Sequence, residues 1–72
     1  MSISADSAKA IALMGVDMII TAESALSGDS VKSIVQIVKS KGRHITVHAG
    51  SRSSDTLKSI ALMGGDHVTI AI

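Results

Sequence analysis

The sequence predicts an α/β fold made of three consecutive helix–strand units, and three observations support this prediction. The segment Lys9–Asp17 returns 49 positions later as Lys58–Asp66. In each copy an amphipathic helix passes through a glycine into an Asp-led apolar run, as a helix does when it leads into a buried parallel strand. A third apolar run, Ile45–Ala49, lies between the two copies. We therefore expect a three-stranded parallel sheet.

The first helix is expected to start near Ser4 or Asp6, since either residue can cap it. It should end at Gly15, in the left-handed conformation that a helix terminus often requires. The strand that follows is centred near Ile19. The apolar helix positions that we expect to face the sheet are Ala8, Ile11, Ala12 and, at the end, Met14.

The second helix should open at Gly28-Asp29-Ser30 with an acidic cap and end at Gly42. Two lysines near its end suit the helix dipole. Its strand is centred near Val47, and the spacing of its apolar residues is that of one helix face. That face consists of Val31, Ile34, Val35 and Val38, and the two lysines are Lys39 and Lys41.

The third helix should begin at Ser54 or Asp55 and close at Gly64, where glycine again takes the left-handed position. A strand centred near Val68 follows. One helix between successive strands is what right-handed parallel crossovers require. The residues that we expect this helix to bury are Leu57, Ile60 and Ala61.

Size and composition suggest that these units are one partial domain over residues 1–72. Hydrophobic residues make up 46% of the 72, yet the chain contains no Phe, Tyr, Trp or Cys. A complete (β/α)₈ TIM barrel needs roughly 250 residues, or about 200 at the compact end. We therefore expect a partial TIM barrel, either a piece of a larger domain or a module whose copies associate and bury the exposed sheet edges.

The charge pattern argues against nucleic-acid and membrane partners. Seven basic and six acidic residues are spread along the chain and give a net charge of +1. Nucleic-acid binders carry a basic cluster, which is missing here. We see no signal peptide and no apolar run of the ~18 residues that a membrane span needs. A cytoplasmic location is the default expectation.

The best candidate site is the loop Gly50-Ser51-Arg52-Ser53-Ser54, because parallel α/β sheets bind ligands at the carboxyl ends of their strands. Gly50 permits close approach of the backbone, Ser51 offers a hydroxyl, and Arg52 supplies charge beside a helix N-terminus. These residues predict a phosphate site. The alternative is that Ser54 or Asp55 only caps the third helix while Arg52 is solvated.

The candidates for acid–base catalysis and for amine catalysis are weaker. Glu23 lies in the other complete loop, 21–28, and is either an acid or base, if buried, or a surface residue. Covalent amine catalysis needs a desolvated lysine. All lysines fall on helices or their ends, so we expect no catalytic residue of that kind; they are Lys9, Lys32, Lys39, Lys41 and Lys58.

Two histidines on the middle strand raise the question of a metal. His44 and His48 share a face with Thr46, and the chain has four methionines, so copper is a conceivable ion. The two histidines are about 13 Å apart at the usual rise of a strand, too far to share one ion. We therefore predict no metal site, with His48 as a polar residue of the barrel interior.

With these elements placed, the chain resembles the later part of the transaldolase and fructose-6-phosphate aldolase family. Ser4–Ala8 and Met14–Asp17 match a Ser-x-x-Gln-Ala segment and Ala-Gly-Ala-Asp, although Ser7 replaces the glutamine. His48–Arg52 is similar to the strand ending Ala-Ala-Ser-x-Arg, and Gly64–Ile70 to Gly-Ala-Asp and a Thr-Ile strand.

The resemblance implies a class I aldolase of carbohydrate (pentose phosphate) metabolism, in which a Schiff-base lysine acts on a sugar phosphate without a cofactor. This chain lacks the strand that bears the lysine. The family serine that contacts phosphate falls on Gly50, beside Ser51, and a family loop arginine falls on Ala25. Arg52 is the one charged position of the family's phosphate site that is retained, so we expect no activity from the chain alone.

A second resemblance is to a family of copper-homeostasis barrels known as CutC. Gly15–Thr21 is similar to its Gly-Val-Asp-Arg-Ile-Leu-Thr segment, and Ile45–Gly50 to a strand before a triple glycine. This match needs gaps around the second helix and leaves His67–Ile70 unmatched. A non-enzymatic α/β module that oligomerises is the remaining alternative.

Overall fold

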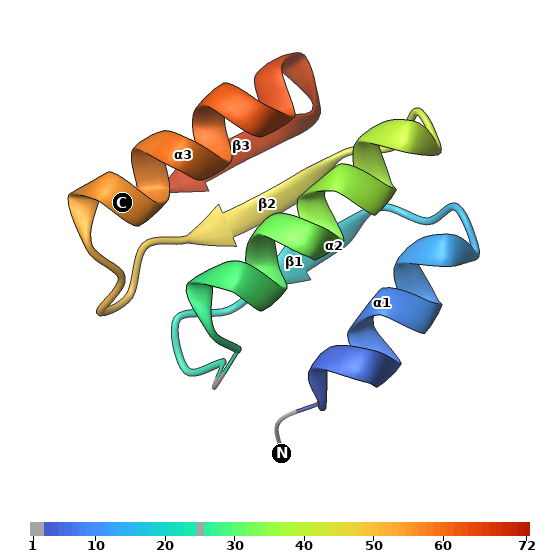
Figure 1. The fold of residues 1–72 in the computed structure, drawn as a ribbon, viewed down its shortest axis with the longest axis horizontal. Coiled ribbons are helices and arrows are strands. Elements are labelled where there is room, and N and C mark those ends of the chain that lie inside the picture. Colours follow the sequence, from blue (N-terminus) through green and yellow to red (C-terminus); the bar gives the residue numbers. More distant parts are fainter. Residues whose placement is uncertain (1–2, 25) are drawn as a thin grey trace.

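Helices and strands alternate along the chain as the sequence predicts. The structure is a computed structural model that describes residues 3–24 and 26–72. Each strand follows one helix, and a short 3₁₀ turn precedes the last strand (Figure 1). The elements are α1 (Ala5–Leu13), β1 (Met18–Ile20), α2 (Gly28–Ser40), β2 (Ile45–His48), α3 (Ser54–Gly64), η1 (Gly65–His67) and β3 (Val68–Ala71).

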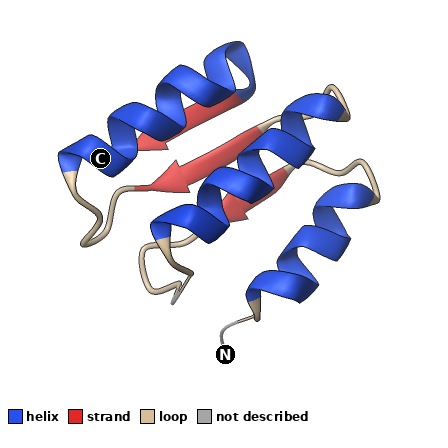
Figure 2. Cartoon of the chain, viewed as in Figure 1, coloured by secondary structure: helices blue, strands red, loops and turns tan. Residues whose placement is uncertain are grey.

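The three strands form a parallel sheet in the order β1-β2-β3, which confirms the predicted three-stranded parallel sheet. Met18, Ile45 and Val68 lie level with one another across it. All three helices lie in one layer on the same side of the strands (Figure 2). Among the residues that the structure describes, one face of the sheet is therefore covered, and nothing covers its other face or pairs with its two edges.

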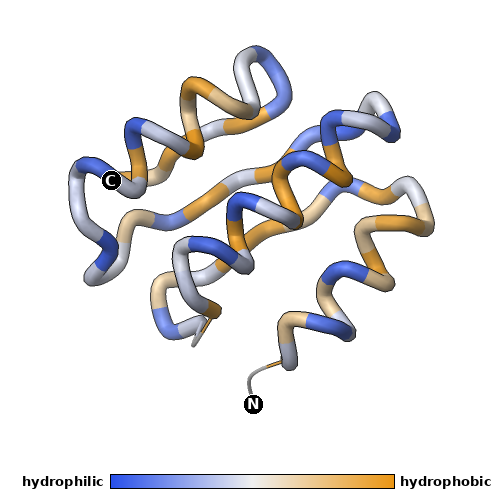
Figure 3. Tube along the Cα trace, viewed as in Figure 1, coloured by the Kyte–Doolittle hydropathy of each residue, from blue (hydrophilic) through white to orange (hydrophobic). Residues whose placement is uncertain are grey.

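The core lies between α2 and the sheet. The predicted apolar face of α2 is completely buried, and so are Ile45, Val47 and Ile60. Apolar positions recur at intervals along α2 (Figure 3). Burying one Val or Ile side chain contributes about 1.5–3 kcal/mol, so aliphatic residues supply this core without an aromatic ring. The fully buried residues of α2 are Val31, Ile34, Val35 and Val38.

Serines cap all three helices. The side chain of Ser4 caps α1, as one of the two predicted alternatives had it. The predicted acidic cap of α2 is wrong, because Ser27 accepts from the backbone N–H of Ser30 and Asp29 lies in the first turn. A carboxylate there still interacts favourably with the helix dipole. For α3 the cap is Ser53, one residue before the predicted start.

The two copies of the repeat end their helices differently. Gly15 has a φ of +80°, the left-handed conformation that the sequence predicts. Gly64 was expected to do the same and does not: it stays helical, and its hydrogen faces Val68, where a Cβ would lie 2.8 Å from the Val68 Cβ. Gly65 takes the positive φ instead, at +55°. Because of the extra turn η1, β3 starts one residue later than β1 does when the two copies of the repeat are aligned.

Two predicted helix faces are wrong at the edges of the structure. Ile11 and Met14 are 38% and 79% exposed instead of buried on the sheet. The reason is that α1 packs against α2 and lies to the side of β1, with no described strand beneath it (Figure 1). Ala61 is exposed and Leu57 half-buried, because α3 is the outermost helix at the other edge.

Among the described residues, no helix has both the length and the apolar character that crossing a bilayer requires.

Candidate functional site

The loops at the carboxyl ends of β1 and β2 lie against each other. Gly50 has a φ of +53°, and a Cβ on it would lie 3.0 Å from the carbonyl oxygen of Ala22. A side chain at position 50 would therefore separate the two loops. Next to them, the N-termini of α2 and α3 meet, since Gly28 faces the methyl group of Thr56. This edge of the sheet thus gathers two loops and two helix starts.

Arg52 is the notable residue at this edge. Its Nη1 donates a hydrogen bond of 2.9 Å to the backbone oxygen of His48. Within the described part of the chain, its Nε and Nη2 are buried and have no hydrogen-bond partner. Each buried donor left without an acceptor costs about 1–3 kcal/mol. The protein therefore holds the guanidinium against the backbone, with two of its donors unpaired.

The structure brings the three predicted site residues into one turn before α3. Gly50 and Ser51 are exposed, whereas Arg52 is half-buried. The alternative in which Arg52 is a solvated side chain is wrong, because its guanidinium is held against the backbone. That alternative also expected Ser54 or Asp55 to cap α3. The cap is Ser53, whose hydroxyl accepts a 3.2 Å hydrogen bond from the backbone N–H of Thr56. Asp55 lies in the first turn of α3 and contributes a negative charge beside the site.

The remaining candidates for acid–base and amine chemistry lie on the surface or on helices. Glu23 is exposed, at the rim of a groove beside β1. Each lysine lies in a helix or, for Lys41, at a helix C-cap, as the sequence predicts, and Lys39 donates to the backbone oxygen of Met63 at 3.2 Å. Ala25, where the aldolase family has a loop arginine, lies outside the described residues.

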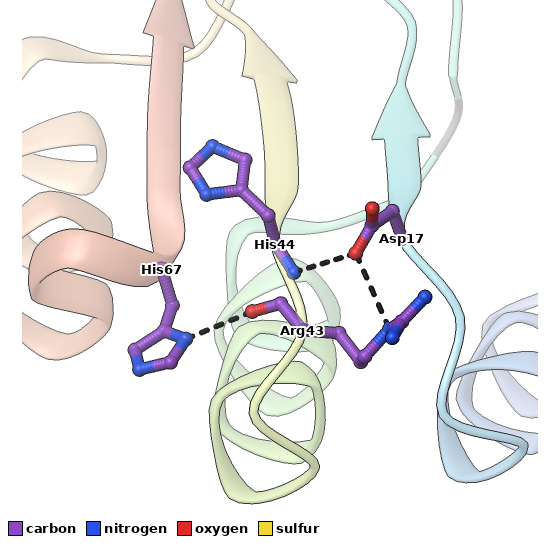
Figure 4. A network of polar contacts seen from close by, with 4 residues as sticks. All are labelled: Asp17, Arg43, His44 and His67. Carbon is purple, nitrogen blue, oxygen red and sulfur yellow. Dashed lines mark hydrogen bonds and ion pairs between the residues drawn. The ribbon is translucent and has the colours of Figure 1, made fainter.

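A polar network joins the strands at their amino ends (Figure 4), whereas Arg52 follows the carboxyl end of β2. Asp17 Oδ1 accepts a 2.9 Å hydrogen bond from the backbone N–H of His44 and lies 3.4 Å from Nε of Arg43. His67 Nδ1 lies 2.8 Å from the backbone oxygen of Arg43. A carbonyl oxygen only accepts, so Nδ1 of His67 carries the proton. An exposed ion pair such as that of Asp17 and Arg43 adds little to the stability of the fold. The hydrogen bonds of the network link the starts of the three strands.

His44, one of the two histidines on the predicted interior face, contacts the neighbouring strand. His44 Nε2 lies 2.7 Å from Oγ1 of Thr69 on β3, across the open face. Among the residues that the structure describes, no three His, Cys, Asp or Glu side chains gather in a way that would hold a metal ion.

One feature was missed by sequence reasoning: a groove of about 560 Å³ between α1 and the free edge of β1. The expectation that α1 covers the sheet concealed it. The groove could have been expected from the strand order. β1 is the first strand of the sheet, and its side away from β2 has no described neighbour. Its apolar lining includes Ile3, Ile11, Met18, Ile19 and Leu26.

The fold and this edge define a small α/β chain with a parallel sheet and an arginine presented at the carboxyl ends of its strands. Compared with protein-family models, with curated proteins and with solved structures, the chain matches none.

Proposed function

We propose that the chain is a segment of a (β/α)₈ barrel of the transaldolase and fructose-6-phosphate aldolase type, and that it binds the phosphate group of a sugar phosphate through Arg52. The observation that carries the proposal is the pair of buried donors on that guanidinium, which have no hydrogen-bond partner among the described residues. Guanidinium groups form short, charge-assisted hydrogen bonds with phosphate oxygens, often two at a time.

The arrangement of the sheet supports a barrel origin. The strands follow one another in space without reversal, and each crossover helix lies on the same side. Doubly wound sheets instead reverse their strand order at the ligand site and carry helices on both faces. In a barrel the bare face, with Thr46 and Thr69 level with each other, would be the interior.

The proposal covers phosphate binding and includes no covalent step. A Schiff base requires a lysine held in a dry site, which lowers the pKa of its amine. The lysines of this chain lie on the helices or at a helix end, so the chain's own part in an aldolase site is to hold the anionic end of the substrate.

Titration calorimetry with inorganic phosphate and with fructose 6-phosphate tests this function. Losing a hydrogen bond to a charged group costs about 1.5–3 kcal/mol, so Arg52→Ala should weaken binding by roughly 10- to 100-fold. The matched control is Arg43→Ala, which removes the same charge from the amino ends of the strands, where it is half exposed. Equal affinities for Arg52→Ala and the unaltered chain would refute the proposal.

A further inference from the structure

The exposed large hydrophobic side chains of the described residues lie at the two ends of the strand order. At the first end they belong to the N-terminal segment, α1, β1 and the turn between them; at the other end they lie on α3 and after β3. Their exposed fractions reach 67% for Ile19, 79% for Met14 and 87% for Leu62. The full set is Ile3, Ile11, Leu13, Met14, Val16, Ile19, Leu62 and Ile72. Exposed apolar residues that gather in this way mark an interaction surface.

The internal repeat shows what the groove beside β1 is shaped to accept. Ile60 of α3 is fully buried, whereas its counterpart in the repeat, Ile11 of α1, is 38% exposed. The helices differ in their surroundings: α3 has a strand, β2, before its own strand in the sheet, and α1 has only the groove. A parallel strand in the groove would give Ile11 the environment of Ile60.

The same comparison at the opposite edge identifies what is missing there. Ala12 of α1 is fully buried, and α1 packs against the next helix, α2. Its counterpart Ala61 of α3 is exposed, because α3 has no described helix on its far side. The edge at β3 therefore accepts a following helix–strand unit, and the edge at β1 accepts a preceding strand.

We propose that copies of this chain associate head to tail, with β3 of one copy lying parallel to β1 of the next, in the groove beneath α1. One junction supplies both missing elements at once: β3 of the first copy fills the groove of the next, and α1 of that next copy covers Ala61 of the first. The chemistry fits, because β3 carries Val68 and Ile70 level with the buried Ile45 and Val47 of β2. Such β-branched side chains pack well between a parallel sheet and its helices.

This interface is heterologous, so repeated copies close into a ring or extend as a filament. It rests on the fold and on the repeat, and does not depend on phosphate binding at Arg52. It also removes both free edges of the parallel sheet, which a protein otherwise has to protect.

Light scattering coupled to size-exclusion chromatography tests the proposal on the full chain, with two blocking variants and one control. Ile11→Lys places a charge in the groove, and Ala61→Lys places one on the far side of α3. Each should weaken association by at least about tenfold, because a charge would be buried without a partner. Gln36→Lys adds the same charge on the exposed face of α2, away from both edges, and should leave the mass of the oligomer unchanged.

Mixing the two blocking variants gives the sharpest result. Each is expected to be a folded monomer by circular dichroism, and an equal mixture should form a dimer, because one intact junction remains between them. A monomeric unaltered chain at high concentration would overturn the proposal, as would a mixture that stays monomeric or an Ala61→Lys variant that still dimerises. Should the charged variants unfold, Ile11→Ser and Ala61→Gln repeat the test with neutral side chains.

Discussion

Replacing Arg52 with methionine should make the protein more stable when phosphate is absent. Two buried donors without acceptors cost about 1–3 kcal/mol each, while one hydrogen bond from a charged group returns about 1.5–3 kcal/mol. In the structure Nε and Nη2 are the unpartnered donors, and Nη1 makes the bond to His48. Methionine keeps an apolar stem of similar length without the charge. The free energy of unfolding should therefore rise by about 1–2 kcal/mol.

The assay is urea unfolding followed by far-ultraviolet circular dichroism, because the chain has no Trp or Tyr for fluorescence. Phosphate at 100 times its dissociation constant should stabilise the unaltered chain by about 2.7 kcal/mol and leave Arg52→Met unchanged. The control Arg43→Met should change stability by less than about 1 kcal/mol, since its ion pair is exposed. A less stable Arg52→Met variant that still responds to phosphate would refute the reasoning.

Three further substitutions test the packing. Gly64→Ala should destabilise the chain by about 1–3 kcal/mol, because the new Cβ would lie 2.8 Å from Val68; an unchanged urea midpoint would contradict this contact. Ile60→Ala should cost about 2–5 kcal/mol, and Ile11→Ala, at a concentration where the chain is monomeric, clearly less; equal losses would show that the repeat buries both residues alike. Asp17→Ala should cost about 0.5–1.5 kcal/mol by removing the acceptor of an exposed backbone N–H, and amide exchange at the start of β2 should quicken; unchanged exchange would argue against that bond.

Local patterns made the element order and the core predictable. The spacing of Val31, Ile34, Val35 and Val38 places them on one helix face whatever the neighbours are, and all four are buried. The alternation along β2 likewise predicts that Ile45 and Val47 lie under the helices. These features depend on the period of a helix or a strand, which the sequence states directly.

Positions at the two edges were predicted poorly, because burial there depends on neighbours that the pattern does not specify. Ile11 and Ile60 stand in nearly identical sequence contexts. Ile60 is buried in a unit whose strand, β3, has β2 beside it, whereas Ile11 belongs to the first unit of the described strand order and is 38% exposed. Gly64 was misassigned for a related reason. Whether a terminal glycine turns left-handed depends on how closely the next strand approaches, and here Val68 packs against it.

The position of the candidate site after β2 could be predicted from the sequence. Whether Arg52 is held by the protein or solvated could not. A loop of Gly, Ser and Arg before a helix predicts a phosphate site, but equally a solvated arginine. What distinguishes them is the burial of two guanidinium nitrogens, at an edge of the sheet where Gly50 lies against Ala22 of the preceding loop. Contacts between residues so distant along the chain are visible only in the folded molecule.

The Nε–H proton of Arg52 reports most directly on the central claim, that this guanidinium is held ready for an anion. Titration of the ¹⁵N-labelled chain with phosphate should shift that resonance, slow its exchange with water, and saturate together with the backbone amides at the start of α3. An Nε–H resonance that does not move while phosphate saturates amides elsewhere on the chain would contradict the account.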